Sequence, residues 1–235
     1  MKITLVGIGG IGGHLARNVC HFLHAARRPD HVVLVDGDAF EEKNRDRMRF
    51  GRPENKAIAL ARELASAYSG VITVEPVPEY VTQETVVTLV GEGDVVLSAV
   101  DNHATRRLLD ARCAELADVV LVSGGNDGIE GGHDGTYGNV QVVRRERGRA
   151  LTASLTAFHP EITDATDYLP TEQGCLELAQ NAPQLLVTNV AVASAMLSAF
   201  WALVCRGTID YEEVYVDVLR NRVNPARRPA PDPGA

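Results

Sequence analysis

Four glycines near the amino terminus have the spacing of a phosphate-binding turn. They are Gly7, Gly9, Gly10 and Gly12, and they separate an aliphatic run from an amphipathic helical pattern. Glycine permits a tight strand-to-helix turn, and backbone N–H groups at the start of a helix bind anions. Asp36, 24 residues after Gly12, is placed to accept hydrogen bonds from ribose hydroxyls. The pattern predicts a nucleotide site, either for NAD or for ATP; glycines that serve only a tight turn are the alternative.

Basic side chains are concentrated after Asp36, although the chain as a whole has a net charge of -8. They are Lys43, Arg45, Arg47, Arg49, Arg52 and Lys56. A triphosphate carries about four negative charges that need Arg and Lys partners, whereas a dehydrogenase has no evident need for them. The basic segment therefore favours ATP over a nicotinamide cofactor, with a solvated basic loop as the alternative.

The order of these residues resembles that of the ThiF/MoeB/HesA family, the adenylyltransferases similar to ubiquitin-activating enzymes. The matching motifs are Asp36-x-Asp38, Asn44-x-x-Arg47, Lys56 at the start of a helix, and Asp101-Asn102 between a strand and a helix. Several motifs in the right order arise by chance far less often than one. Lys43 and Met48 stand where the family has serine and glutamine, so two polar partners in the phosphate loop differ.

The resemblance implies an enzyme that binds ATP and Mg²⁺. It implies that Asp36 binds ribose, that Arg47 and Lys56 contact the phosphates, and that Asn44 helps to position them. Asp101 is the implied magnesium ligand, because this hard ion prefers oxygen; an N-cap role for Asp101 is the alternative. The expected catalytic residues are Arg47, Lys56, Asp101 and Cys175, and the expected cofactor site adds Asp38, Asn102 and the four glycines.

The resemblance also implies a substrate, the C-terminal glycine of a ubiquitin-like or sulfur-carrier protein. Its carboxylate, ionised at neutral pH, attacks the α-phosphorus of ATP and releases pyrophosphate. Cys175 lies where some sulfur-transfer relatives carry a reactive cysteine, so it is a candidate acyl acceptor; an inert cysteine is the alternative. Three other functions stay open: activation of a peptide or small-molecule carboxylate in natural-product or RNA modification, an NAD(P)-dependent oxidoreductase, and a non-catalytic subunit of an activating enzyme.

Cysteine spacing, net charge and hydropathy argue against several other kinds of site and classes of protein. None of the four cysteines forms a Cys-x-x-Cys pair, so we expect no zinc and no disulfide framework; Cys20 and Cys205 are expected to pack on helix faces. The absence of a signal-peptide pattern favours the cytoplasm. The negative charge argues against nucleic-acid binding. Polar residues interrupt the apolar segment 185–205, so no membrane span is expected. The family resemblance implies a homodimer.

Strands and helices alternate along the part of the chain that carries these residues. We expect strands at residues 3–6, 31–35, 71–76, 95–100 and 119–123, and helices at 15–23, 55–68, 82–89 and 104–116. This alternation predicts an α/β fold with a Rossmann-like, doubly wound, mostly parallel sheet in residues 1–125. Strands at 139–144 and 149–156 predict an antiparallel C-terminal extension. A long segment at 159–184 and a helix from residue 185 complete the same domain to residue 223. The proline-rich tail, 224–235, is expected to be disordered.

Overall fold

The computed structural model describes residues 1–41, 51, 53–129, 132–163, 168–171 and 184–227. Within these residues, nine strands form one sheet in the order β3-β2-β1-β4-β5-β6-β8-β9, and β7 pairs with β6. The strands are β1 (Lys2–Val6), β2 (His31–Val35), β3 (Thr73–Val77), β4 (Val95–Ser98), β5 (Val119–Asn126), β6 (Tyr137–Glu146), β7 (Arg149–Ala150), β8 (Glu213–Asp217) and β9 (Arg222–Ala226). The helices are α1 (Gly10–Ala25), α2 (Lys56–Ala67), α3 (Val86–Leu89), α4 (His103–Glu115), α5 (Leu155–Phe158) and α6 (Leu186–Trp201).

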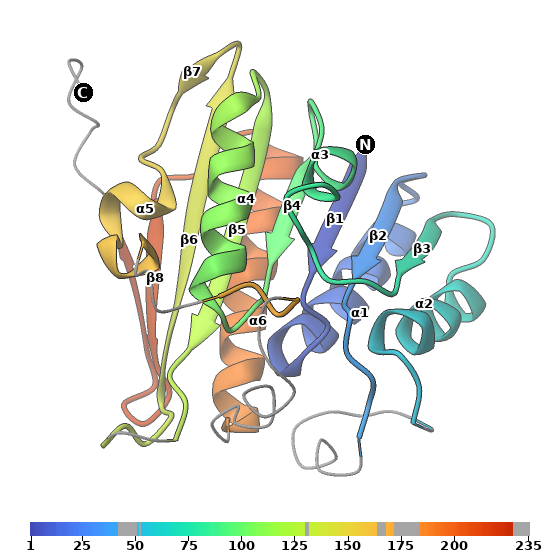
Figure 1. Ribbon diagram of the computed structural model, residues 1–235, viewed down its shortest axis with the longest axis horizontal. Coiled ribbons are helices and arrows are strands. Elements are labelled where there is room, and N and C mark those ends of the chain that lie inside the picture. Colours follow the sequence, from blue (N-terminus) through green and yellow to red (C-terminus); the bar gives the residue numbers. More distant parts are fainter. Residues whose placement is uncertain (42–50, 52, 130–131, 164–167, 172–183, 228–235) are drawn as a thin grey trace.

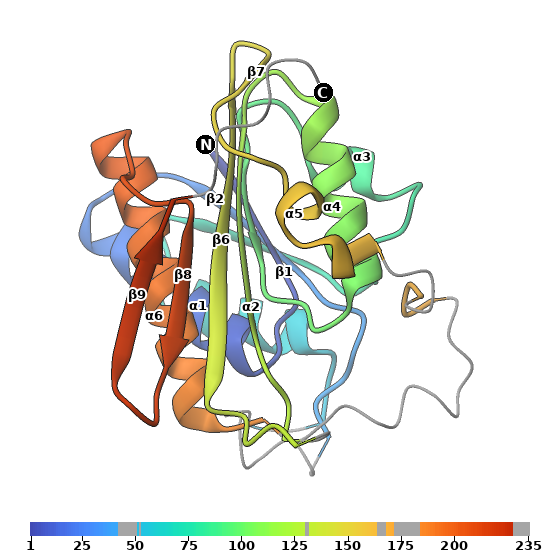
Figure 2. The ribbon, with the colours of Figure 1, turned by 90° about the vertical axis from the view of Figure 1, so that its left-hand side faces the viewer.

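Helices cover both faces of the sheet (Figure 1). On one face, α1, α2 and α6 bury a core that includes Leu5, Leu15 and Phe200. On the other face, α3, α4 and α5 cover a second core that includes Val96 and Leu109. Figure 2 shows the two helical layers on either side of the strands. The doubly wound α/β architecture predicted from the alternation of elements is therefore confirmed.

The strand directions place the ends of the first strands at a common edge. Strands β1 to β5 run parallel, with Val6 of β1 opposite Val35 of β2 and Ser98 of β4. Strands β6, β8 and β9 continue the sheet in antiparallel fashion, which confirms the predicted antiparallel extension. Ligands of open α/β sheets bind beyond the carboxyl ends of parallel strands, so the connections after β1, β2 and β4 are where a site is expected.

The predicted strand at residues 149–156 is wrong beyond its first two residues. Only Arg149–Ala150 pairs with β6, and a short helix, α5, follows. The side chain of Asp110 on α4 accepts hydrogen bonds from the backbone N–H groups of Leu155 and Thr156 at 2.9 and 3.1 Å. Ser154 caps α5 by accepting from the N–H of Ala157. Side chains thus satisfy the backbone groups that a strand would have paired. The helix expected at 82–89 is also shorter, because only Val86–Leu89 is helical.

The segment after α6 contains two strands that the sequence analysis did not predict. β8 pairs with β6, and β9 pairs with β8. Residues 224–226, expected to begin a disordered tail, belong to β9, while 228–235 lie outside the described residues. Proline is tolerated in an edge strand because its missing N–H is not needed there. Both outer strands of the described sheet contain one, Pro76 in β3 and Pro225 in β9.

Helix α6 is the longest apolar element. Together with the π-helical turn Ala202–Arg206 it is the one described segment whose length and hydropathy would allow it to cross a membrane. In this fold it packs against the sheet instead. A Cβ atom at Gly124 of β5 would lie 2.3 Å from the sulfur of Met196, and one at Gly138 of β6 would lie 2.4 Å from Val192. The two glycines therefore let α6 approach the strands closely.

Candidate active site

The glycine-rich turn connects β1 to the first turn of α1. Gly7 has a φ of +87°, a conformation that glycine adopts without steric cost, and its N–H donates to the carbonyl of Val35 on β2. A Cβ atom at Gly12 would lie 1.8 Å from the carbonyl oxygen of Gly7, so only glycine lets α1 begin this close to the turn. The first backbone bond into α1 runs from the N–H of Gly13 to the carbonyl of Gly9 at 2.9 Å. Earlier N–H groups of the helix therefore lack intrahelical acceptors and can bind an anion.

Asp36 follows β2 and points at this turn. Its Oδ2 accepts a hydrogen bond from the N–H of Ile8 at 2.6 Å, and its Oδ1 accepts one from the N–H of Asp38 at 2.8 Å. Burial raises the pKa of Asp36, and the charge of Asp38 acts in the same direction, while Lys56 and the two N–H groups oppose the shift. The carboxylate is thus held next to the glycines, at the position expected for a ribose-binding acid.

Asp38 and Lys56 form an ion pair beside Asp36. The Nζ atom of Lys56 lies 2.7 Å from Oδ2 of Asp38. Lys56 is the first residue of α2, and its backbone N–H also donates to the carbonyl of Asp38. Asn55 reinforces this junction, because its Nδ2 donates to the carbonyls of Asp36 and Asp38 while its Oδ1 caps α2 at the N–H of Ile58. The start of α2 is therefore attached to the Asp36–Asp38 segment.

Tyr80 is a residue of this site that the sequence analysis missed. It lies after β3, its ring packs against Gly37, and its hydroxyl donates to Oδ1 of Asp38. Burial raises the pKa of Tyr80, and the hydrogen bond to Asp38 and the charges of Asp38, Asp36 and Asp101 add to the effect. The charges of three predicted site acids thus act on one tyrosine. No motif marked it; only its position after a parallel strand was a signal.

Asp101 and Asn102 lie between β4 and α4 and have different roles. Asn102 caps α4, because its Oδ1 accepts from the N–H of Thr105 at 2.8 Å. The alternative that Asp101 is the cap is therefore wrong. Arg106 stabilises the connection between β4 and α4, because its Nε and Nη2 donate hydrogen bonds to the carbonyl of Val100. Asp101 is exposed and makes no hydrogen bond or ion pair within the described part of the chain.

The exposed carboxylate of Asp101 fits a magnesium ion, which is commonly held by one or two carboxylates together with phosphates and water. No group of three or more His, Cys, Asp or Glu side chains in the described ranges is arranged to hold a metal. A magnesium ion at Asp101 would therefore depend on phosphate oxygens for most of its ligands.

Three predicted site residues, Asn44, Arg47 and Cys175, lie outside the described residues, as does most of the basic segment. The other cysteines are free. Burial raises the pKa of both Cys20 and Cys113 to about 12, so these thiols stay protonated at neutral pH. Cys205, expected to pack on a helix face, is exposed instead, because it lies in the π-helical turn after α6.

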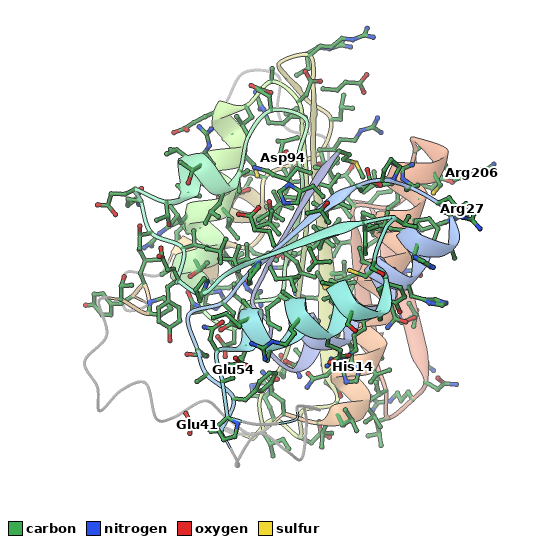
Figure 3. All side chains as sticks on the ribbon, turned by 90° about the vertical axis from the view of Figure 1, so that its right-hand side faces the viewer. His14, Arg27, Glu41, Glu54, Asp94 and Arg206 are labelled. Carbon is green, nitrogen blue, oxygen red and sulfur yellow. The ribbon has the colours of Figure 1, made fainter. Side chains whose placement is uncertain are left out.

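The site lies at one end of the molecule. Figure 3 shows Glu54, which precedes Asn55 and Lys56, at the same end of the molecule as Glu41 and His14, while Asp94, which directly precedes β4, lies toward the opposite end. The glycine turn, Asp36 and Asp101 follow the parallel strands β1, β2 and β4, so they share the edge formed by the carboxyl ends of these strands. Lys56 joins them through its ion pair with Asp38.

Comparison with models of protein families identifies the family of this chain. The model of the ThiF family matches residues 1–212. The chain belongs to the ThiF family. A SAMP-activating enzyme E1 of Haloferax volcanii is 30% identical over 133 residues, which cover 55% of this chain and 47% of that protein. Molybdopterin-synthase adenylyltransferase of Escherichia coli is 28% identical over 136 residues, which cover 55% of this chain and 51% of that protein. This ThiF chain thus spans about half the length of the curated relatives it matches.

Solved structures share the fold of this ThiF protein. The crystal structure of E. coli MccB with selenomethionine MccA has a TM-score of 0.70 at 14% identity, and the match covers 98% of this chain and 65% of that chain. The structure of E. coli MccB with ATP has a TM-score of 0.66 at 14% identity, covering 97% and 64%. At this identity the likeness establishes the Rossmann-like fold with its antiparallel extension, in agreement with the sequence prediction.

Proposed function

We propose that this ThiF-family chain uses ATP to adenylate a carboxylate. The carboxylate oxygen bonds to the α-phosphorus, the bond from that phosphorus to the pyrophosphate oxygen breaks, and an acyl adenylate and pyrophosphate result. The observation that carries this proposal is the junction of the glycine turn with Asp36 and Lys56: the carboxylate of Asp36 bonds to Ile8 in the turn, and the buried Lys56 is held beside it through Asp38. Both matched curated relatives are named as activating or adenylylating enzymes.

Each described residue has a distinct proposed role. Asp36 accepts hydrogen bonds from the ribose. The N–H groups of the turn containing Gly7, Gly9, Gly10 and Gly12 bind phosphate. When ATP binds, Lys56 exchanges its ion pair with Asp38 for one with the phosphates, and it stabilises the charge that develops on the leaving pyrophosphate. Asp101, with Asn102 beside it, holds a magnesium ion, which neutralises phosphate charge when bound. Arg47 and Asn44 are proposed to complete the phosphate site.

We propose the C-terminal glycine of a ubiquitin-like or sulfur-carrier protein as the substrate. The names of the two curated relatives support a protein substrate, since one activates SAMP and the other acts on molybdopterin synthase. A peptide or small-molecule carboxylate is the second candidate, and the crystal structures of MccB with MccA favour it. An NAD(P)-dependent oxidoreductase and a non-catalytic subunit have no such support.

The acyl group is proposed to pass to Cys175. Its thiolate would attack the acyl carbon, form a thioester and release AMP. The test is a Cys175→Ala variant. If the thioester forms, this variant should retain pyrophosphate exchange but lose the covalent adduct with the carrier, seen as a mass shift under non-reducing conditions. Full multiple turnover by Cys175→Ala would favour the second candidate substrate class.

We further propose a cytoplasmic homodimer. The outer side of α6 presents Val187, Val190 and Trp201, which are 61%, 44% and 47% exposed and lie on one face at helical spacing. A homodimer that buried this apolar face would remove it from water. Sedimentation velocity should give twice the monomer mass, and a Val190→Asp variant should sediment as a monomer.

The adenylation proposal is tested by magnesium-dependent exchange of labelled pyrophosphate into ATP. The reaction contains the purified chain and one candidate at a time: carrier proteins ending in glycine, the same carriers lacking that glycine, and small carboxylates. We expect exchange with an intact carrier and none with the truncated one. Binding of NADH without any exchange would contradict the proposal.

A further inference from the structure

The side-chain amide of Asn189 on α6 is buried with an unpartnered donor. The residue is fully buried. Its Oδ1 accepts a hydrogen bond from Nδ2 of Asn126 at the end of β5, at 2.9 Å, whereas its own Nδ2 has no hydrogen-bond partner among the residues that the structure describes. Buried donors in folded proteins nearly always have acceptors, because an unpaired one is unfavourable. The unpaired donor of Asn189 therefore indicates that a bound ligand supplies its acceptor.

The unpartnered Nδ2 points at the first turn of α1. A Cβ atom at Gly10 would lie only 2.1 Å from this nitrogen, so the amide occupies the space that any side chain at Gly10 would take. The backbone N–H groups of the same turn precede the first intrahelical bond, from Gly13 to Gly9. One side-chain donor thus joins several backbone donors at the end of the helix, where the helix dipole also favours an anion.

The surrounding structure holds this amide in place. Asn126 determines the orientation of the amide through its hydrogen bond to Oδ1. The close packing of α6 on Gly124 and Gly138 leaves the helix no room to shift toward the sheet. Because the donor is already oriented, binding an acceptor requires little further ordering.

We propose that Asn189 donates a hydrogen bond through Nδ2 to a phosphoryl oxygen bound at the amino end of α1, with Asn126 as its positioning residue. This inference rests on the proposed binding of ATP. Because Asp36, the proposed ribose acid, bonds to Ile8 in the same turn, the phosphate at this place is the one attached to the ribose. The Oε1 of Gln184 lies 3.2 Å from a Cβ atom built at Gly10. The side chain of Gln184 therefore has to move aside for the phosphate to bind.

The test compares the affinities for ATP, AMP and adenosine by isothermal titration calorimetry. Asn189→Leu keeps the approximate size of the side chain and removes the donor. A hydrogen bond to a charged group corresponds to about tenfold to a hundredfold in affinity. We expect Asn189→Leu to weaken ATP and AMP by this factor and to leave adenosine unchanged. The matched control is Thr188→Val, also fully buried on α6, which loses the hydrogen bond from Oγ1 to the carbonyl of Gly135 at 2.7 Å without touching the turn.

Asn189→Asp provides a second test if the leucine variant is unstable. It keeps the acceptor for Asn126 and replaces the donor with a negative oxygen, so AMP should again weaken selectively relative to adenosine. The inference is overturned if the ratio of AMP to adenosine affinity in both Asn189 variants equals that of the wild type and of Thr188→Val. In that case pyrophosphate exchange by the wild type would still uphold adenylation. A wild-type chain that binds neither ATP nor AMP would overturn both.

Discussion

The Nζ atom of Lys56 lies 2.7 Å from the Oδ2 atom of Asp38, so the cation proposed to bind phosphate is neutralised by a carboxylate when no nucleotide is bound. The side chain of Lys56 is 11% exposed, whereas that of Asp38 is 43% exposed. A buried charge without a partner is costly. Asp38 therefore pairs with the buried ammonium group of Lys56, and we expect a phosphate to take its place when nucleotide binds.

Lys56→Gln should slow pyrophosphate exchange strongly. Loss of one group that stabilises developing charge in a transition state lowers rates about 100-fold to 1000-fold. The measurement is the initial rate of exchange at saturating ATP. Arg62→Gln on the same helix is the control, because Arg62 pairs with Glu54 at the surface, and it should change the rate less than twofold. Equal losses in both variants would show that the helix charge in general, and not Lys56, supports catalysis.

Substitutions at Asp101 and Asn102 should affect different properties: magnesium dependence for Asp101 and stability for Asn102. Asn102→Ala removes the cap of α4 and should lower the free energy of unfolding by about 1 kcal/mol. Asp101→Asn removes a carboxylate that makes no hydrogen bond or ion pair with the described residues, so stability should change little while the magnesium concentration needed for exchange rises. Urea denaturation and a magnesium titration measure the two effects. An Asp101→Asn variant with wild-type magnesium dependence would refute the proposed metal role.

Gly12 and Gly13 are adjacent but should respond differently to alanine. In Gly12→Ala, the new Cβ would lie 1.8 Å from the carbonyl oxygen of Gly7, so the turn must distort, at a cost of about 1–3 kcal/mol in stability, and nucleotide binding should fail. In Gly13→Ala, the nearest atom is the Nη1 of Arg17 at 3.5 Å, and the helix should gain about 0.5–1 kcal/mol. Thermal unfolding and ATP titration of both variants check this contrast.

His159 should make stability depend on pH. Its Nε2 lies 2.6 Å from buried Glu213 and its Nδ1 lies 2.7 Å from Glu161; His103 also acts on Glu161. The hydrogen bond to Glu213 is the main cause that raises the pKa of His159 above 6.5, and burial opposes it. This contribution to stability is complete below pH 6.5, the unfolded value, and is lost as pH rises through the folded pKa. Wild type should therefore exceed His159→Gln in free energy of unfolding by more at pH 5.5 than at pH 8.5. A difference independent of pH would show that this ion pair contributes nothing.

Local patterns were sufficient to predict the first strand, the glycine turn, the first helix and the second strand. The glycines, the two short aliphatic strands and the position of Asp36 lie within 36 residues, so periodicity and turn chemistry determined them together. At residues 149–156, where a strand was expected, the side chain of a distant residue was responsible for the difference. Asp110 accepts hydrogen bonds from the N–H groups of Leu155 and Thr156, which lie 45 and 46 positions further along the chain, and this contact supports α5 in place of a strand.

The two C-terminal strands were missed for a different reason. In β8, Val214 and Val216 alternate with Glu213, Tyr215 and Asp217, a pattern typical of strands, but the prolines that follow suggested a tail. The partner of β8 is β6, which begins more than 70 residues earlier. Within the candidate site, the acids and Lys56 were found from motifs, whereas Tyr80, Asn55 and Asn189 act through contacts that only the folded chain reveals.

The prolines in the two outer strands limit how this protein can associate. An unpaired strand edge is a template on which another chain can build, and Pro76 and Pro225 each remove a donor from such an edge. Growth of the sheet by strand addition is hindered on both sides. Association by strand addition is therefore disfavoured at both edges of the described sheet, and the two prolines protect the chain against the stacking of strands that leads to aggregation.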